Sequence, residues 1–232
     1  MKKLIFGVFA HPDDEAFGPS ATLMKEADDG AEVYLICATK GEGGMNQEGH
    51  DDLAAVRMRE WSDACDLIGA KDHFSLDFAD GSLSNSVYKA LVTKIEEVVR
   101  RVCEDQEEPF ELCLMTYDGN GITGHLDHIA VSSAVTFVFY RLQQAPPGYA
   151  RVSELAYFCL SEEQMPMPNW DYFTFWPAGY AAENINRRVD VREYKDRKYK
   201  VMEAHVSQRR DAEYFFSRGD EFHNVDNFYV IS

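Results

Sequence analysis

KLIFGVFAHPDDE (residues 3–15) joins a run of apolar side chains to a cluster of ionisable ones. The apolar part, Lys3 to Phe9, contains β-branched and aromatic residues and predicts a buried β-strand. His11, Asp13 and Asp14 follow it almost at once. In an open parallel sheet, ligands bind outside the carboxyl ends of the strands, where the loops converge. This one segment therefore predicts the start of a sheet and the position of a site.

The same alternation continues along the chain. Further apolar runs predict strands at Glu32 to Ala38, His73 to Phe78, Glu111 to Thr116, Ser153 to Leu160 and Asn227 to Ile231. Helical periodicity and helix-stop signals predict helices at Ala21 to Asp29, Asp52 to Ile68, Ser86 to Cys103, His125 to about Leu142 and Glu193 to Ala204. Strands that alternate with helices predict an α/β fold of three layers, Rossmann-like, with a mostly parallel sheet and helices on both faces.

The length of 232 residues suits a single domain. We expect residues 1–145 to form the α/β core with the site, and residues 146–232 to supply cleft-lining loops, the last helix and a closing strand. Prolines and aromatic residues crowd the irregular segment 161–186, most densely at 170–176. This aromatic segment is either a packed surface loop or a loop that lines a substrate cleft.

Charge and cysteine content limit the possible partners. The chain has 23 basic and 40 acidic residues, a formal charge of −17, which disfavours nucleic acid and anionic membranes. No apolar run is long enough to predict an integral membrane segment. The cysteines are odd in number and widely spaced, so we expect reduced core residues in a cytoplasmic protein. The sequence leaves a homo-oligomer open. The cysteines are Cys37, Cys65, Cys103, Cys113 and Cys159.

A second ionisable cluster, Gly124-His125-Leu126-Asp127-His128, follows the fourth predicted strand. Because both clusters follow strands at the same edge of the sheet, we expect them to lie close together. Imidazole and carboxylate groups together suit zinc, which in catalytic sites takes three protein ligands. His11 and Asp14 can both point inward, and one of the two histidines of the second cluster can complete the set. Asp13 is then a spare carboxylate placed to act as a general base.

These residues also admit a purely structural interpretation. Asp13 and Asp14 could cap the helix that follows them, because aspartate is a favoured capping residue. His125 and Asp127 could do the same for the fourth helix.

The two clusters together resemble the motifs of the PIG-L/LmbE-type zinc de-N-acetylases. Ala10 to Glu15 is similar to the opening signature of that family, and His125 to His128 is similar to its H-x-D-H motif. Weaker similarities follow in the family order, at Thr39 to Gly43, Arg57 with Glu60, Asp80-Gly81 and Ala204 to Gln208. Leu126 stands where many members carry proline, a position that supplies only backbone.

The resemblance implies a role for each matched residue. It implies His11, Asp14 and His128 as metal ligands, Asp13 as the base, His125 as the group that stabilises the oxyanion and helps protonate the amine, Asp127 as a group that orients a histidine, and Arg57, Asp80 and His205 as substrate-binding residues. Two of these roles have alternatives: Arg57 could form a surface ion pair with Glu60, and Asp80 could belong to an ordinary Asp80-Gly81 turn. Glu42 is either a pocket residue or the exposed tip of a glycine-rich loop.

We therefore expect a zinc-dependent amidohydrolase that removes an N-acyl group from an N-acetylglucosamine-type glycoconjugate, with iron as a possible metal in the cell. Two alternatives stay open. One is a magnesium-dependent phosphohydrolase or nucleotide-handling enzyme that uses the carboxylates of residues 13–15, although imidazole favours zinc over magnesium. The other is a non-catalytic sugar-binding module on the same scaffold.

Overall fold

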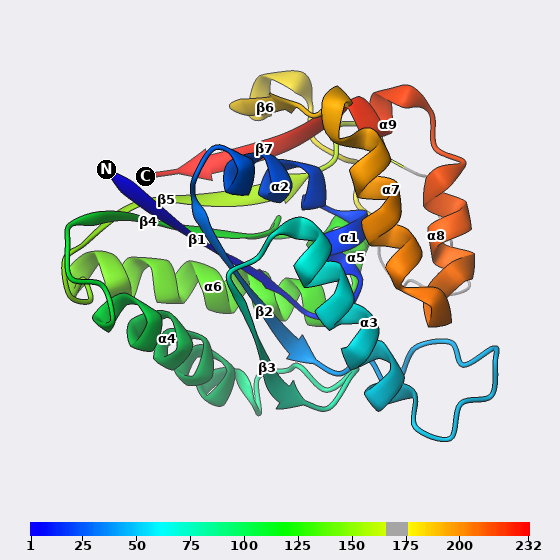
Figure 1. Cartoon of the computed structure of the whole chain (residues 1–232), viewed down its shortest axis with the longest axis horizontal. Helices are drawn as coiled ribbons and strands as arrows, with labels where there is room; N and C mark the ends of the chain where they lie inside the picture. The colour runs from blue at the N-terminus through cyan, green and yellow to red at the C-terminus, as the bar shows by residue number, and fades with distance from the viewer. Residues whose placement is uncertain (166–175) are drawn as a thin grey trace.

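Seven strands form one sheet in the part of the chain that this computed structural model describes, residues 1–165 and 176–232. Their order across the sheet is β3-β2-β1-β4-β5-β7-β6 (Figure 1). β1 to β5 run parallel, and β7 is antiparallel to both β5 and β6. The strands are β1 (Lys2–Phe9), β2 (Glu32–Thr39), β3 (Asp72–Phe78), β4 (Phe110–Tyr117), β5 (Ala150–Cys159), β6 (Arg187–Asp190) and β7 (Val225–Ile231).

Helices cover both faces of the sheet, which gives the three layers that the sequence predicts (Figure 1). Side chains of β1 alternate between two apolar cores, with Phe6 in one and Ile5 in the other. The core with Phe6 includes residues of α4 and α6, and the core with Ile5 includes residues of α2, α3 and α7. These helices are α2 (Ser20–Asp28), α3 (Leu53–Ile68), α4 (Tyr88–Glu104), α6 (Leu126–Gln144) and α7 (Lys195–Ala204).

Every predicted strand and helix is present, with ends shifted by a few residues. The two ends of α3 show why the start and stop signals in the sequence predicted the helix correctly. Its N-cap Asp52 accepts a hydrogen bond from the Ala55 N–H at 2.9 Å, and Gly69 ends it in the left-handed conformation at φ 85°.

Short elements were not predicted. They are α1 (Asp14–Phe17), α5 (Gly121–Gly124), α8 (Arg209–Phe216), α9 (Asp220–Asn224), the edge strand β6 and the 3₁₀ helices η1 (Ala182–Asn184), η2 (Arg192–Tyr194) and η3 (Val206–Gln208). β6 lacks an apolar signal because charged side chains occupy most of its length, as is common at sheet edges. The first turn of the predicted last helix is η2, so α7 begins at Lys195 rather than Glu193.

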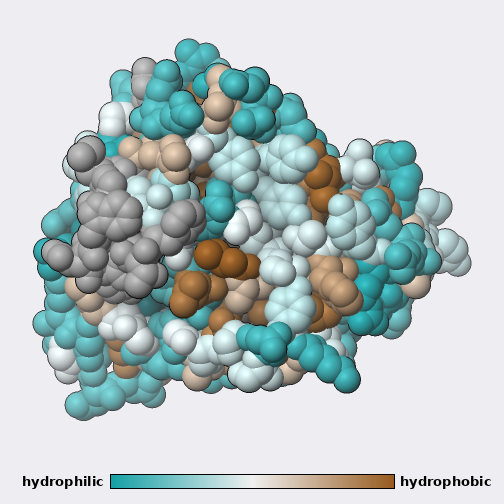
Figure 2. Space-filling view, turned by 180° about the vertical axis from the view of Figure 1, so that it is seen from behind, coloured by the Kyte–Doolittle hydropathy of each residue, from teal (hydrophilic) through white to brown (hydrophobic). Residues whose placement is uncertain are grey.

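All five cysteines are free and buried, as expected of core residues. Of the aromatic segment, residues 170–175 lie outside the described residues. Within residues 1–165 and 176–232, no helix is long and apolar enough to cross a membrane. The face seen in Figure 2 is mostly hydrophilic, with a small group of hydrophobic residues near its centre.

The strand order changes direction at β1, because β2 lies on one side of it and β4 on the other. The carboxyl ends of β1 and β4 are therefore adjacent, with Gly7 of β1 paired to Met115 of β4. Such a switch point leaves a crevice between diverging connections, where open α/β sheets bind ligands.

Candidate metal centre and active site

Both ionisable clusters lie at this switch point. His11 to Asp14 form a turn that follows β1 and runs into α1. After β4, the Asp118 carboxylate accepts hydrogen bonds from the backbone N–H groups of Asn120 at 2.7 Å and Ile122 at 3.3 Å. These bonds shape the turn through α5 that leads into α6, which carries His128 in its first turn.

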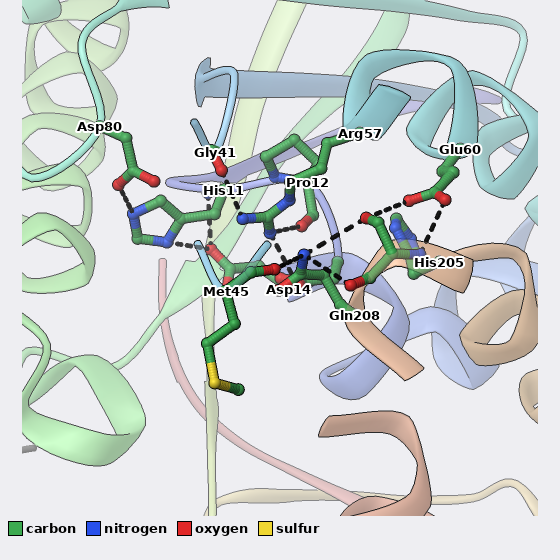
Figure 3. A network of polar contacts seen from close by, with 12 residues as sticks. His11, Pro12, Asp14, Gly41, Met45, Arg57, Glu60, Asp80, His205 and Gln208 are labelled. Atoms are coloured by element: carbon green, nitrogen blue, oxygen red, sulfur yellow. Dashed lines mark hydrogen bonds and ion pairs between the residues drawn. The ribbon is translucent and has the colours of Figure 1, made fainter. Parts of the chain in front are cut away.

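His11, Asp14 and His128 point toward one another. Nδ1 of His11 lies 3.1 Å from Nε2 of His128. The Asp14 carboxylate lies 3.6 Å from that His11 nitrogen and 3.2 Å from that His128 nitrogen. In Figure 3, the His11 ring lies between Asp80 on one side and Asp14 on the other. The three residues proposed as metal ligands are thus brought together from two strand ends.

The outer nitrogen of each imidazole has a hydrogen-bond acceptor. Nδ1 of His128 lies 3.1 Å from the Gly121 carbonyl. Nε2 of His11 lies 3.0 Å from Asp80 Oδ1 and 3.3 Å from Asp127 Oδ2. Since these acceptors bind N–H groups, the inner nitrogens are left with lone pairs. Two imidazole lone pairs and a carboxylate then face one another, and only a cation or a shared proton can balance them.

A tetrahedral metal ion fits this geometry. Ligand atoms about 2.1 Å from a tetrahedral centre lie roughly 3.4 Å from one another. The two imidazole nitrogens are 3.1 Å apart, Oδ1 of Asp14 is 3.2 Å from the His128 nitrogen, and Oδ2 of Asp14 is 3.6 Å from the His11 nitrogen, all close to that value. In metal sites, the ring nitrogen of a histidine that does not bind the metal usually donates a hydrogen bond to a carboxylate or a carbonyl, as the outer nitrogens can do here. Ligand atoms of His11, His125 and His128 lie within 4.8 Å of one another, as do those of His11, Asp80 and Asp127, so His125 is a further donor near the same position.

Protons compete with a metal ion for the position between His11, Asp14 and His128. Burial lowers the pKa of His11, but its hydrogen bonds to Asp127, Asp14 and Asp80 outweigh burial and raise that pKa well above the usual value. Burial opposes ionisation of Asp14, yet His128 and His11 hold its pKa well below the usual range. The site therefore favours a positive charge between the imidazoles, and metal binding would release a proton.

Asp13 lies beside these residues in a strained backbone conformation. Its φ of 108° and ψ of −21° cost a non-glycine residue roughly 1–3 kcal/mol. The carboxylate is buried, and Oδ2 accepts a hydrogen bond from Nη2 of Arg57 at 2.8 Å. Burial raises the pKa of Asp13 to about 7, although Arg57 acts in the opposite direction. A carboxylate with a pKa near 7 suits a general base that works near neutral pH.

His125 is neutral near pH 7. Burial, together with the charges of His128 and His11, lowers its pKa to about 4. As the N-cap of α6, its Nδ1 accepts the backbone N–H of Asp127 at 3.2 Å, which leaves the ring proton on Nε2. His125 can therefore donate a hydrogen bond from Nε2, but it does not carry a charge.

Asp80 and Asp127 both contact His11. Asp127 also accepts hydrogen bonds from the backbone N–H groups of Gly81 at 2.8 Å and Leu83 at 3.1 Å, so it ties the β3–α4 loop to α6. The orienting role that the resemblance implies for Asp127 stays a prediction, and the contact with His11 is where it would act.

The loop that contains Glu42 is hydrogen-bonded to Asp80. Glu42 is exposed, and Oε1 accepts the backbone N–H of Asp80 at 2.9 Å. Oδ2 of Asp80 accepts the N–H of Gly43 at 2.9 Å. The carboxylate of Asp80, proposed as a substrate contact, is thus engaged by His11 and Gly43.

Arg57 does not form the surface ion pair that the sequence left open. Its side chain is 4% exposed, and besides Asp13 it donates to the carbonyls of Pro12 and Gly41 (Figure 3). Glu60 instead accepts hydrogen bonds from the backbone N–H and the hydroxyl of Ser207. These contacts favour a role for Arg57 in holding Asp13, and its part in substrate binding stays a prediction.

His205 is fully buried, whereas the resemblance implied a substrate-binding residue. Its Nε2 lies 2.8 Å from Oε1 of Glu15, which is also fully buried. Sequence reasoning gave Glu15 a role only in the magnesium-dependent alternative, as the last carboxylate of residues 13–15. It also missed the Gly121 carbonyl, because a backbone acceptor has no signal in the side-chain pattern.

Comparison with known proteins agrees with the motifs. Residues 6–139 match the family described as PIG-L: GlcNAc-PI de-N-acetylase. The chain belongs to this family. A relative in Salinispora arenicola, named 1D-myo-inositol 2-acetamido-2-deoxy-alpha-D-glucopyranoside deacetylase, is 28% identical over 260 aligned residues, which cover 97% of this chain and 83% of the relative.

Solved structures of PIG-L-like architecture cover almost the whole chain. N,N'-diacetylchitobiose deacetylase from Pyrococcus horikoshii gives a TM-score of 0.70 at 20% identity, over 99% of this chain and 84% of that one. The 4-carboxy-2-hydroxymuconate hydratase GalB from Pseudomonas putida KT2440 also gives 0.70, at 15% identity, over 99% and 96%. At these identities the likeness shows the fold alone. The same architecture occurs in proteins named for two reactions, so the reaction has to be argued from the site.

Proposed function

We propose that this chain is a zinc-dependent hydrolase that removes the N-acetyl group from an N-acetylglucosamine-type amino sugar. The observation that carries the proposal is the meeting of one imidazole nitrogen each from His11 and His128 with the Asp14 carboxylate within 3.1 to 3.6 Å, beside the buried Asp13. Family membership and the relatives named as deacetylases of N-acetylated sugars support the reaction and the substrate class. A cytoplasmic location and a homo-oligomer stay predictions.

The donor set supports zinc over magnesium. His11, His128 and Asp14 offer two nitrogens and one carboxylate, a combination that suits zinc, whereas magnesium prefers oxygen ligands and retained water. Zinc in such a site acts as a Lewis acid that polarises a carbonyl and makes water more acidic. The donors suit ferrous iron as well, so metal analysis has to distinguish the two.

Asp13 is proposed as the general base. Its carboxylate lies next to the ligand Asp14 in sequence, and its pKa of about 7 lets it accept a proton from an attacking water near neutral pH. The same carboxyl group can then return the proton to the departing amine. Arg57 fixes the carboxylate through a 2.8 Å hydrogen bond.

His125 is proposed as the donor to the oxyanion that develops on the amide oxygen. The neutral ring with its proton on Nε2 can donate a hydrogen bond, which is how oxyanion-stabilising groups act. Because the pKa of His125 is lowered to about 4, the proton for the amine is better supplied by Asp13.

Acetate release after substitution of Asp13 tests the proposal. We expect the wild-type protein, loaded with zinc, to release acetate from N,N'-diacetylchitobiose or from an N-acetylglucosaminyl-inositol. Asp13→Asn should lower kcat by roughly 10²- to 10⁴-fold, the usual contribution of a general base, while zinc content is unchanged.

Asp77→Asn is the matched control, since Asp77 is an exposed aspartate that also has a positive φ, 58°. It should keep wild-type turnover. If Asp13→Asn holds zinc and turns over at the wild-type rate, Asp13 is not the base. If the wild-type protein releases no acetate from any N-acetylglucosamine conjugate, the substrate class is wrong.

A further inference from the structure

A fully buried acid–base pair lies behind the site and has no part in the proposed reaction. Nε2 of His205 is 2.8 Å from Oε1 of Glu15, and both side chains are 0% exposed. Nδ1 of His205 is buried and has no hydrogen-bond partner among the described residues. Burial of such a pair costs desolvation energy that apolar side chains of similar size would avoid. Packing alone therefore does not explain it.

The pair reaches the backbone of the proposed base. Oε2 of Glu15 accepts a hydrogen bond from the N–H of Asp13 at 3.2 Å. This N–H belongs to the residue whose φ of 108° is strained. A strained conformation persists only when surrounding contacts hold it. Glu15 provides such a contact, and His205 fixes the carboxylate of Glu15 from the other side.

The helix α3 is connected to Asp13 in two ways, directly through Arg57 and indirectly through Glu60. Arg57 of α3 binds the carboxylate of Asp13 directly. One turn later, Glu60 accepts two hydrogen bonds from Ser207, at 2.8 Å and 2.6 Å. Ser207 lies in η3, which directly follows His205. These hydrogen bonds attach η3 to α3. Because η3 directly follows His205, they also help to hold the imidazole of His205 against Glu15.

We propose that His205 and Glu15 are positioning residues that hold the backbone of Asp13 so that its carboxylate faces the reacting water. The proposal rests on the proposed role of Asp13 as the base. Neither residue touches the substrate. Their effect is on the orientation of Asp13, and small errors in the position of a catalytic group reduce turnover more than binding.

Two amide variants of His205 separate positioning from packing. Glutamine can place its Nε2 where the imidazole Nε2 lies, whereas asparagine is shorter and cannot reach Glu15. We expect His205→Asn to lower kcat roughly 10- to 100-fold with KM within about two-fold of wild type. His205→Gln should recover most of the lost kcat, and zinc affinity should be unchanged in both variants.

His223→Asn is the matched control. His223 is also a fully buried histidine of the C-terminal part, and its Nε2 contacts the Phe215 carbonyl, away from Asp13. It should lower stability without lowering kcat. If His205→Asn keeps wild-type kcat, or if His205→Gln is as impaired as His205→Asn, the positioning role is refuted.

A second measurement does not depend on activity. Amide hydrogen exchange of Asp13, followed by NMR in the metal-free protein, reports its bond to Glu15 directly. Loss of one buried hydrogen bond should speed exchange at Asp13 by roughly ten-fold in His205→Asn but not in His205→Gln or His223→Asn. Unchanged exchange in His205→Asn would overturn the proposal. If the exchange pattern holds while the wild-type protein shows no deacetylase activity, the fault lies with the proposed function instead.

Discussion

Two opposing effects set the charge of Asp13 at the residue scale. Burial favours the protonated acid and raises its pKa to about 7, while the guanidinium of Arg57 favours the carboxylate. A base must be ionised to accept a proton, so activity should fall as the pH falls below the pKa of Asp13. Arg57 therefore extends the active range toward lower pH.

Removal of the Arg57 charge should move the acidic limb of the pH profile. In Arg57→Met, nothing offsets the burial of Asp13, so its pKa rises above about 7 and the acidic limb of kcat/KM shifts to higher pH. Arg57→Lys keeps a positive charge and should shift the limb less. Arg59→Met, at an exposed position of the same helix, serves as the control. An acidic limb that stays in place, or moves to lower pH, in Arg57→Met contradicts this account.

Asp127 should affect the metal through His11. Its Oδ2 is 3.3 Å from Nε2 of His11, on the side of the ring opposite the proposed metal. Asp127→Asn places an uncharged amide there, so the ring is less well oriented and less basic. Loss of such a partner typically lowers metal affinity 10- to 100-fold. Competition with a chromogenic chelator measures the metal affinity, and Asp63→Asn, at an exposed position, is the control. Equal metal affinity of the two variants would show that Asp127 does not affect metal binding.

At the scale of elements, the sequence predicted the strands and helices whose apolar side chains are arranged in a pattern that follows their burial. Side chains of β1 such as Ile5 and Phe6 lie in the two cores, and its position inside the sheet, between β2 and β4, explains why the run is almost continuously apolar. The edge strand β6 has one side in contact with solvent and charged side chains, so its pattern resembles a loop. The short helices α1 and α5 are single turns, too brief for periodicity.

Part of the site was predictable because it depends on which strand ends share an edge of the sheet. The ends of β1 and β4 could be placed at one edge from the topology, so the approach of His11 to His128 followed. The contact of Glu15 with His205 joins positions 190 residues apart and depends on how the C-terminal helices pack. Nothing local in the sequence carries that information. The burial of Arg57 was missed because its helix position alone does not show which neighbour its long side chain reaches.

The buried Lys198 should be essential for the attachment of α7. Its Nζ donates to the Gly18 carbonyl at 2.7 Å and lies 3.5 Å from Asp226 of β7. Asp226 also accepts hydrogen bonds from Thr22 of α2. Lys198→Met leaves a buried carboxylate without its cation, and breaking such a pair costs about 3–5 kcal/mol.

Urea unfolding measures this cost. The double variant Lys198→Met with Asp226→Asn removes the unpaired charge, so it should be more stable than Lys198→Met alone. Lys200→Met, on the exposed side of α7, should change stability little. A loss below about 1 kcal/mol in Lys198→Met, the size of a surface pair, would show that the pair is effectively solvated.

At the scale of the whole molecule, part of the charge of −17 lies at the site, where Asp14, Asp80 and Asp127 are within 3.6 Å of His11 and Asp13 acts electrostatically on Asp14. A divalent cation should therefore stabilise the native chain, because it binds only where these groups are assembled. Free zinc at 100 times its Kd contributes about 2.7 kcal/mol to the free energy of unfolding. For a chain of this size, 1 kcal/mol corresponds to about 2–4 °C in Tm.

We therefore expect zinc to raise Tm by about 5–11 °C over protein treated with a chelator. His128→Gln removes one of the three inner ligand atoms while it keeps the size and polarity of the side chain similar. In that variant the rise in Tm at the same zinc concentration should be much smaller, because its Kd is higher. Calorimetric scans of both proteins, with and without zinc, make the comparison. An equal rise in both would place the stabilising zinc somewhere other than between His11, Asp14 and His128, and the argument from converging lone pairs would then fail.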